Sequence, residues 1–238
     1  MRILFFGALL IMSTLVSAQK ISKNKKAILQ SIEKHNTELI AISDSIWALA
    51  ETAFNEKQSS VILANYAEKN GFSVERGVSG MSTAFVATYG SGKPVIGILG
   101  EFDALPGISQ KAQPTKEALN EGAAGHGCGH NLFGTASLGA AVAVKELIEQ
   151  GEIKGTIKFF GTPAEEKYFG KVWMVRDGLW DDVDVNLSWH PGDNTEADAQ
   201  STLALVDFKV EFFGQAAHAS SDPWNGRSAS DALELYTT

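Results

Sequence analysis

The sequence of 238 residues predicts an α/β fold, with a mostly parallel β-sheet and helices on both faces. Short apolar or alternating segments, typical of strands, take turns along the chain with longer segments of helical periodicity. Glycine-containing turns such as Asn70-Gly71 and residues 90–92 separate these segments. Polar residues able to bind metal follow the predicted strands, which is where sites form in open α/β sheets.

Each predicted element has its own pattern. Residues 24–50 carry isoleucine and leucine near helical spacing, and residues 59–69 form a helix that ends at Asn70-Gly71. Residues 104–125 are predicted to be a long loop, which in a compact domain usually has a function. The further predicted helices cover residues 135–149, 171–176 and 228–235, and the predicted strands cover 83–89, 94–99, 156–160, 183–189 and 202–213.

The first residues have the pattern of a secretory signal peptide. Arg2 is followed by an apolar run and then by Val16-Ser17-Ala18, small residues typical of a cleavage point. The apolar run is too short for a comfortable membrane span. We therefore expect cleavage near Ala18, export to the periplasm or secretion, and no membrane association.

Composition excludes one class of partner and narrows the chemistry. The formal charge is −8, and no basic cluster follows the first residues, so we expect no nucleic acid to bind. Hydrophobic residues make up 44% of the chain, which is enough for a globular core. An exported protein with one cysteine has no internal disulfide, which favours a chemical role for Cys128.

Cys128 and His130 are separated by one glycine inside a glycine-rich segment. Glycines allow a tight backbone that turns both side chains toward one point. Thiolate, imidazole and carboxylate ligands together suit a transition metal such as zinc. On this motif alone, a buried free cysteine that acts as a small hydrophobe is an equal alternative.

Polar residues gather where one edge of the predicted sheet would collect them. Glu165 and Glu166 follow a predicted strand, so one carboxylate can bind metal while the other serves as a general base. On their own they fit a polar helix start better. Asp103 either caps a loop or orients a ligand, His126 either supports a ligand or supports the loop, and His190 is a ligand or an exposed loop residue. Placement of all these groups at one edge favours a single site, assembled from Asp103, Cys128, His130, Glu165, Glu166 and His190.

Five segments resemble the amidohydrolase branch of the zinc-peptidase family that includes aminoacylase and glutamate carboxypeptidase. The resemblance runs in order from about residue 25 to the last residue and implies roles for six residues. Cys128, His130, Glu166 and His190 match metal ligands, Glu165 matches the general base, and His218 matches a lid-domain histidine. Asp103, proposed above from its position after a strand, is counted with Glu165 and His218 among the catalytic candidates. The segments are GILGEFDALPG, GHGCGHNLFGTASLGAA, GTPAEEKYFGK, NLSWHPG and FFGQAAHASSDPWNGRSASDALEL.

The resemblance also implies an activity. A divalent metal, with two zinc or manganese ions per site, activates water for attack on the amide of an N-acyl amino acid. Glu165 takes up the proton, and His218 helps to bind the substrate and the developing oxyanion across a dimer. The alternatives are a dipeptidase of the same family and a non-catalytic partner subunit.

Two residues and the length depart from the family pattern. Asn131 stands where many relatives have aspartate, and Glu101 stands where other branches have aspartate or a histidine ligand. Relatives are longer and carry a last ligand histidine near their C-terminus. The expected domains are therefore a signal peptide over 1–18, an incomplete catalytic domain over 19–200, and the start of a small α+β lid and dimerisation domain over 201–238. This chain alone is expected to be inactive, and the lid is expected to form a homodimer or a heterodimer with a paralogous subunit.

Overall fold

The computed structural model describes residues 21–197 and 201–238. The contacts within the chain divide it into two compact units, and the boundary along the sequence lies between Asp193 and Asn194. The expected domain boundary at residue 200 stays a prediction, and the predicted signal peptide lies outside the described residues. Within those described ranges, no helix is both long and apolar enough to cross a membrane.

A five-stranded sheet in the order β1-β2-β4-β3-β5 forms the centre of the first unit. β3 runs parallel to both β4 and β5, while β2 runs antiparallel to β4 and to β1. Thus β2 alone among these strands runs against the others, which confirms the mostly parallel sheet. The strands are β1 (Ser73–Arg76), β2 (Phe85–Ser91), β3 (Val95–Glu101), β4 (Gly155–Thr162) and β5 (Val185–Leu187).

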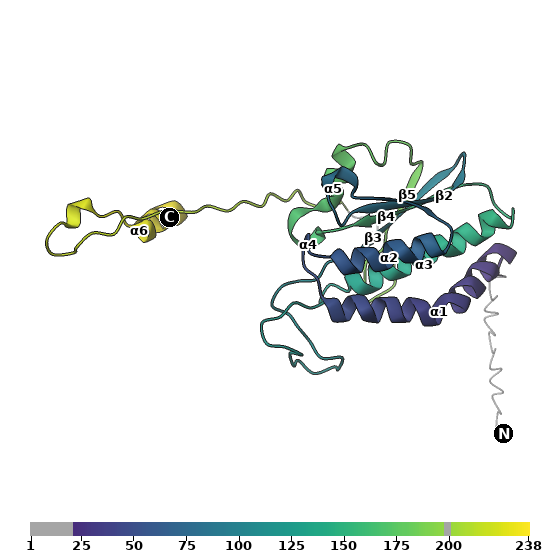
Figure 1. Ribbon diagram of the computed structural model, residues 1–238, viewed down its shortest axis with the longest axis horizontal. Helices are drawn as coiled ribbons and strands as arrows, with labels where there is room; N and C mark the ends of the chain where they lie inside the picture. The colour runs from purple at the N-terminus through teal and green to yellow at the C-terminus, as the bar shows by residue number, and fades with distance from the viewer. Residues whose placement is uncertain (1–20, 198–200) are drawn as a thin grey trace, which may run out of the picture. The chain divides into compact units, whose positions relative to one another are not determined.

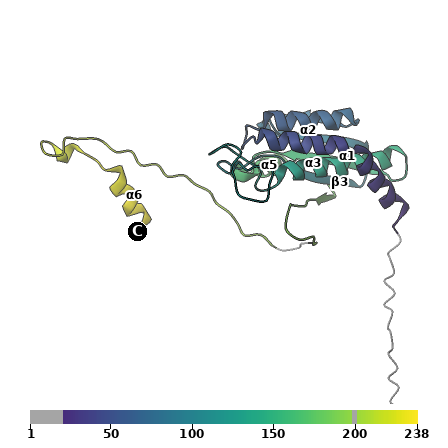
Figure 2. The same ribbon diagram turned by 90° about the horizontal axis from the view of Figure 1, so that it is seen from below.

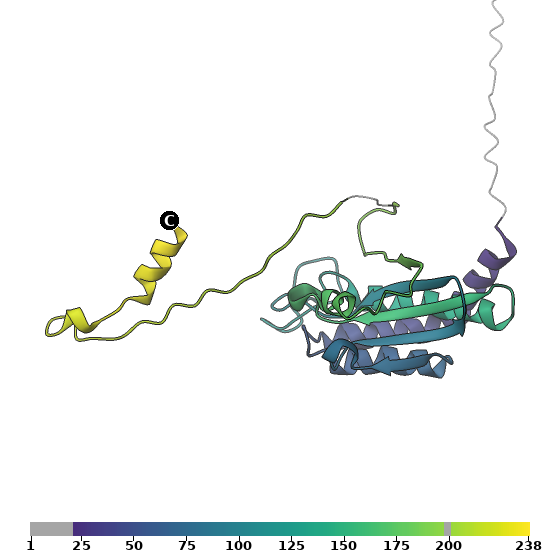
Figure 3. The ribbon, with the colours of Figure 1, turned by 90° about the horizontal axis from the view of Figure 1, so that it is seen from above.

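Three long helices cover one face of the sheet (Figures 2 and 3). They are α1 (Lys23–Leu49), α2 (Lys57–Lys69) and α3 (His130–Glu149). Alternate side chains of β2 and β4 point toward them, so Phe85 and Phe159 join Leu63 of α2 and Leu138 of α3 in one buried apolar cluster. α1 packs against α3 and α2 and adds Ile46 to the same cluster.

The short helix α5 (Gly170–Arg176) lies on the other side of the sheet from α1, α2 and α3 (Figure 1), and a smaller apolar cluster lies there. The intervening side chains, Val86 of β2 and Phe160 of β4, pack there against Met174 of α5. Trp180 stacks on Phe160 with ring centroids 4.2 Å apart. Helices therefore lie on both faces, as the sequence predicts.

Several boundaries differ from the prediction. α3 begins at His130 rather than near residue 135, and the sequence analysis missed the short β1 and the four-residue helix α4 (Glu165–Tyr168). Only residues 185–187 of the strand predicted at 183–189 pair with β3. Short elements carry too few residues to show a period.

The strand predicted at 202–213 is wrong. These residues form neither helix nor strand, and the described part of the second unit has a short 3₁₀ turn, η2 (Pro223–Asn225), and helix α6 (Ala229–Thr237). A strand needs a neighbour for its backbone hydrogen bonds. The described residues of this unit provide one isolated bridge, between Gln215 and Arg227, so the alternating pattern pairs with nothing.

Candidate metal centre

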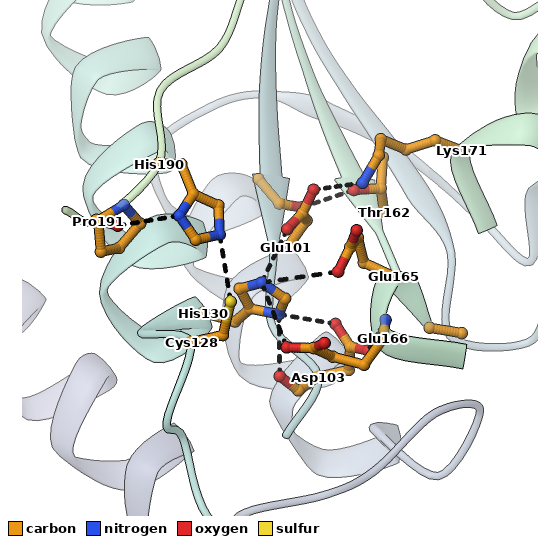
Figure 4. Close-up of polar contacts among 12 residues, drawn as sticks. Glu101, Asp103, Cys128, His130, Thr162, Glu165, Glu166, Lys171, His190 and Pro191 are labelled. Atoms are coloured by element: carbon orange, nitrogen blue, oxygen red, sulfur yellow. Dashed lines mark hydrogen bonds and ion pairs between the residues drawn. The ribbon is translucent and has the colours of Figure 1, made fainter. Parts of the chain in front are cut away.

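The ends of three strands and the start of one helix converge at one place (Figure 4). Parallel strands bring their carboxyl ends to the same edge, so residues distant in sequence meet there. Asp103 follows β3, Glu165 and Glu166 follow β4, His190 follows β5, and Cys128 and His130 lie at the start of α3.

His130 is the centre of the cluster and is fully buried. Its Nδ1 lies 2.9 Å from Asp103 Oδ1 and 3.1 Å from the backbone oxygen of the same residue. Because both partners accept, Nδ1 carries a proton and Nε2 faces the other polar groups. Nε2 lies 3.9 Å from Glu166 Oε1 and 4.0 Å from Glu165 Oε2.

Two groups of possible ligand atoms share His130. In the first, ligand atoms of Cys128, His130 and His190 all lie within 4.8 Å of one another. The Cys128 Sγ to His190 Nε2 distance is 3.4 Å. The second group joins Glu101 and Glu165 to His130. The predicted ligand Glu166 meets this cluster through its approach to His130.

Some of these atoms are buried but make no hydrogen bond. Within the described part of the chain, His130 Nε2, Glu166 Oε1 and Glu101 Oε2 have no hydrogen-bond partner, although Nε2 and Glu101 Oε2 lie only 2.9 Å apart. Buried polar atoms without partners cost free energy, and a cation would satisfy all three. The donor set of thiol, imidazole and carboxylate therefore fits a transition metal.

The local backbone explains how the first ligands are presented. Gly129 has a φ of 77°, a left-handed conformation that glycine adopts readily, and it directly precedes α3. A Cβ at this position would lie 2.9 Å from Pro191 Cγ. The close approach of the segment after His190 therefore also requires a glycine at position 129. Trp189 Nε1 donates to Ser137 Oγ of α3 at 2.9 Å, which holds the residue before His190 against this helix.

The polar helix start considered for Glu165 and Glu166 is present, because both residues open α4. It does not turn them away from the cluster, since both carboxylates approach His130. The Glu166 backbone N–H donates to Asp103 Oδ2 at 2.9 Å. Asp103 thus contacts two of the predicted site segments.

The carboxylates of the cluster favour a bound cation. Burial opposes the charged form of His130, but the hydrogen bond with Asp103 and the nearby Glu101 carboxylate raise its pKa to about 10. Burial and the neighbouring Glu166 carboxylate raise the pKa of Cys128 to about 12. Without an ion, this site holds protons on the ring and the thiol. A bound cation reverses that preference and favours neutral imidazole and thiolate.

Lys171 belongs to the site, and the sequence analysis treated it only as part of a helix. Its ammonium pairs with Glu101 Oε1. Burial tends to raise the pKa of Glu101, but His130 and Lys171 outweigh it and lower that pKa. The chain positions are 70 apart, so no local pattern indicates the contact.

His218 lies in the second unit and is not among the clustered residues. Its backbone N–H donates to Asp222 Oδ1 at 2.9 Å, and its Nδ1 accepts from the Ser220 backbone at 3.3 Å. His126 donates from Nε2 to the Ile46 carbonyl at 3.1 Å and links its loop to α1. Burial lowers the pKa of His126 to about 4, which keeps this ring neutral.

A cluster of metal-ligand side chains at the carboxyl edge of an α/β sheet is typical of metal-dependent hydrolases. The profile of peptidase family M20/M25/M40 matches residues 97–236. The chain therefore belongs to this family of hydrolases, which agrees with the resemblance noted from its motifs.

Two curated relatives are similar to this chain over most of its length. The chain is 47% identical to one of the subunits of the p-aminobenzoyl-glutamate hydrolase of Escherichia coli, over 87% of its own length and 44% of the relative. It is 29% identical to the Xaa-Arg dipeptidase of Mus musculus over 93% of this chain and 50% of that one. The chain spans about half of the length of these curated relatives.

One solved structure combines the fold with metal binding. The Bacillus subtilis protein YXEP, a dinuclear metal-binding peptidase of the M20 family, aligns with a TM-score of 0.56 and 25% identity. The alignment covers 65% of this chain and 42% of that protein.

Proposed function

We propose that the protein cleaves the amide bond of N-acyl amino acids, with p-aminobenzoyl-glutamate as the first candidate substrate. The observation that carries this proposal is the convergence of a thiol, a second imidazole and several carboxylates around His130. Similarity to the p-aminobenzoyl-glutamate hydrolase of Escherichia coli supports the substrate class. Similarity to the Xaa-Arg dipeptidase keeps a dipeptide as the second candidate substrate.

The proposed ligands of a divalent ion are Cys128, His130, Glu166 and His190. The unpartnered buried atoms of His130 and Glu166 support a cation, and the softness of the Cys128 thiol supports zinc, with manganese as the alternative. The second group around His130, formed with Glu101 and Glu165, supports room for a second ion. Such ions supply a lowered pKa for water and polarisation of the amide carbonyl.

Glu165 is the proposed general base. Its side chain is about one-third exposed, so it reaches both the cluster and solvent. Burial and the neighbouring Glu101 raise its pKa, which brings a carboxylate closer to the range useful for proton transfer at neutral pH. Glu165 takes a proton from the attacking water and delivers it to the leaving nitrogen. Asp103 holds the His130 ring in place meanwhile.

The remaining assignments concern the whole protein. His218 is proposed to bind substrate and oxyanion from a lid domain that begins near residue 201. That lid would join two copies of the chain, or this chain and a paralogous one, and the Escherichia coli relative supports this because its name makes it one part of a multi-chain hydrolase. Export after cleavage near Ala18 is part of the same proposal.

The test uses the full-length protein, its bound metal and the release of glutamate from p-aminobenzoyl-glutamate. Glu165→Gln is expected to keep metal content and unfolding midpoint and to lower turnover by about a hundredfold or more, the scale of a general base. Cys128→Ala is expected to lose metal. Glu75→Gln removes an exposed carboxylate on β1 and serves as the matched control.

Each alternative has its own outcome. Metal binding without hydrolysis of any N-acyl amino acid or dipeptide would identify a non-catalytic partner subunit. Hydrolysis of dipeptides alone would select the dipeptidase. Near-normal turnover of Glu165→Gln would show that Glu165 is not the general base.

A further inference from the structure

The backbone just before Glu165 adopts a conformation that its sequence disfavours. Ala164 is fully buried and has a φ of 58° and a ψ of 36°, in the left-handed region. Residues other than glycine occupy this region at a cost, and they stay there only where the surroundings hold them. Ala164 has no side-chain group that could cap α4, so another part of the chain must provide the hold.

Glu56 provides a direct contact to this residue. Its carboxylate Oε1 accepts a hydrogen bond from the Ala164 backbone N–H at 2.8 Å, although the two residues are 108 positions apart. Glu56 directly precedes α2 and is fully buried. The contact therefore ties the N-terminal end of a core helix to the segment that presents Glu165.

Stability alone does not account for a carboxyl group at this position. Oε2 of Glu56 is buried and has no hydrogen-bond partner among the described residues. Burial raises the pKa of Glu56 to about 7. A buried ionisable group with one unsatisfied oxygen is costly, and an apolar side chain would fill the same space without that cost.

A second buried carboxylate makes the matching contact two residues later. Asp103 Oδ2 accepts from the Glu166 backbone N–H at 2.9 Å. The amides on either side of Glu165 are thus each bound to a buried acidic side chain, one from the start of α2 and one from the end of β3.

We infer that Glu56 is a positioning residue, which fixes the direction of the Glu165 carboxylate by holding the Ala164 amide in its left-handed turn. The inference rests on the proposed role of Glu165 as general base. A base that moves by about 1 Å loses much of its rate advantage, since proton transfer requires hydrogen-bond distance. Among the described residues, the Glu56 side chain hydrogen-bonds to the Ala164 amide and to none of the proposed ligand atoms.

The test compares three variants of the full-length protein. Glu56→Leu removes the acceptor, and Glu56→Gln keeps an acceptor oxygen without the acid. Leu63→Ala opens a cavity in the apolar cluster, about two turns further along the same helix. The measurements are hydrogen exchange of the Ala164 amide, metal content, unfolding midpoint, kcat and KM.

Glu56→Leu is expected to speed exchange of the Ala164 amide by about tenfold or more. It is expected to lower kcat by a similar factor, with KM and metal content unchanged. Glu56→Gln should stay near the wild-type values. Leu63→Ala should lower the unfolding midpoint and keep kcat.

Three results would overturn the inference: unchanged kcat in Glu56→Leu, an equal loss of kcat in Leu63→Ala, or an equal loss in Glu56→Gln. If Glu56→Leu does not fold, rapid exchange of the Ala164 amide in the wild type also contradicts it. An inactive wild type would instead refute the proposed function, and amide exchange would still report on the Glu56 contact.

Discussion

The strands β3 and β4 take part in two buried regions of opposite character. Along their length they contribute to the apolar cluster under α1, α2 and α3, where Ile157 and Phe159 are fully buried. Beyond their ends, Asp103 and His130 are just as buried but ionisable. Burial of apolar area contributes about 25 cal/mol per Å², whereas burial of ionisable groups costs free energy unless they are paired. The apolar region therefore supplies the folding free energy that offsets the cost of burying the ionisable groups of the site.

The largest effect on stability is expected in the apolar region. Ile157 lies in β4 at a distance of several residues from the site, so Ile157→Ala should lower the free energy of unfolding by about 2–5 kcal/mol through lost burial and a cavity. Urea unfolding measures the change, with Ile157→Val as a milder control at about 1 kcal/mol. Metal content per folded molecule should remain that of the wild type. Loss of metal would show that the two regions are not separable.

In the polar region, a substitution should change metal affinity rather than the free energy of unfolding. Asp103→Ala frees the His130 ring and the Glu166 amide, and metal affinity should fall by about 10- to 100-fold. Competition with a metal chelator measures that affinity. Asp184 is the matched control, because its Oδ2 accepts from the Val95 amide at the other end of β3 at 2.7 Å. An equal loss of affinity in Asp184→Ala would make the effect non-specific.

A smaller effect is expected from alanine substitutions at two glycines, which distinguish the cost of backbone strain from a change in the geometry of the site. Gly129→Ala and Gly151→Ala both place a side chain at positive φ, 77° and 72°, which should cost about 1–2 kcal/mol of stability in each. Only at Gly129 would the new Cβ also meet Pro191, while nothing lies within 4 Å at Gly151. Metal affinity, measured by calorimetry, should therefore fall in Gly129→Ala alone. Equal affinities in the two variants would contradict this account of the Cys128–His130 turn.

The smallest effect concerns pH and lies in the helical layer. Burial tends to raise the pKa of Glu146, but hydrogen bonds from Lys34 and His35 outweigh it and lower the pKa to about 2. A carboxyl with a depressed folded-state pKa stabilises the fold above about pH 4.5, and this contribution disappears as the pH falls toward 2. Glu146→Gln should thus remove roughly 1–2 kcal/mol at neutral pH, after a discount for the exposed Lys34. Urea unfolding at pH 7 and pH 3 should show a smaller difference between wild type and variant at pH 3; an equal difference would be inconsistent with it.

Periodic segments were predictable from the sequence, and short or isolated ones were not. The helix at 24–50 appears as α1, because a long apolar stripe at helical spacing has few alternatives. The strand expected at 202–213 does not form, although its alternating pattern is clear. Alternation describes a face that fits a sheet, and only a neighbouring strand turns that face into structure.

The sequence by itself determined the fold class, the family and the chemical types at the site, since the Cys-Gly-His spacing and the Glu165-Glu166 pair are local patterns. Only the tertiary structure decided which distant groups meet them. Lys171 pairs with Glu101, and Glu56 binds the Ala164 amide, across 70 and 108 positions. Such contacts depend on how helices pack on a sheet, and that packing leaves no period or spacing in the residues that it joins.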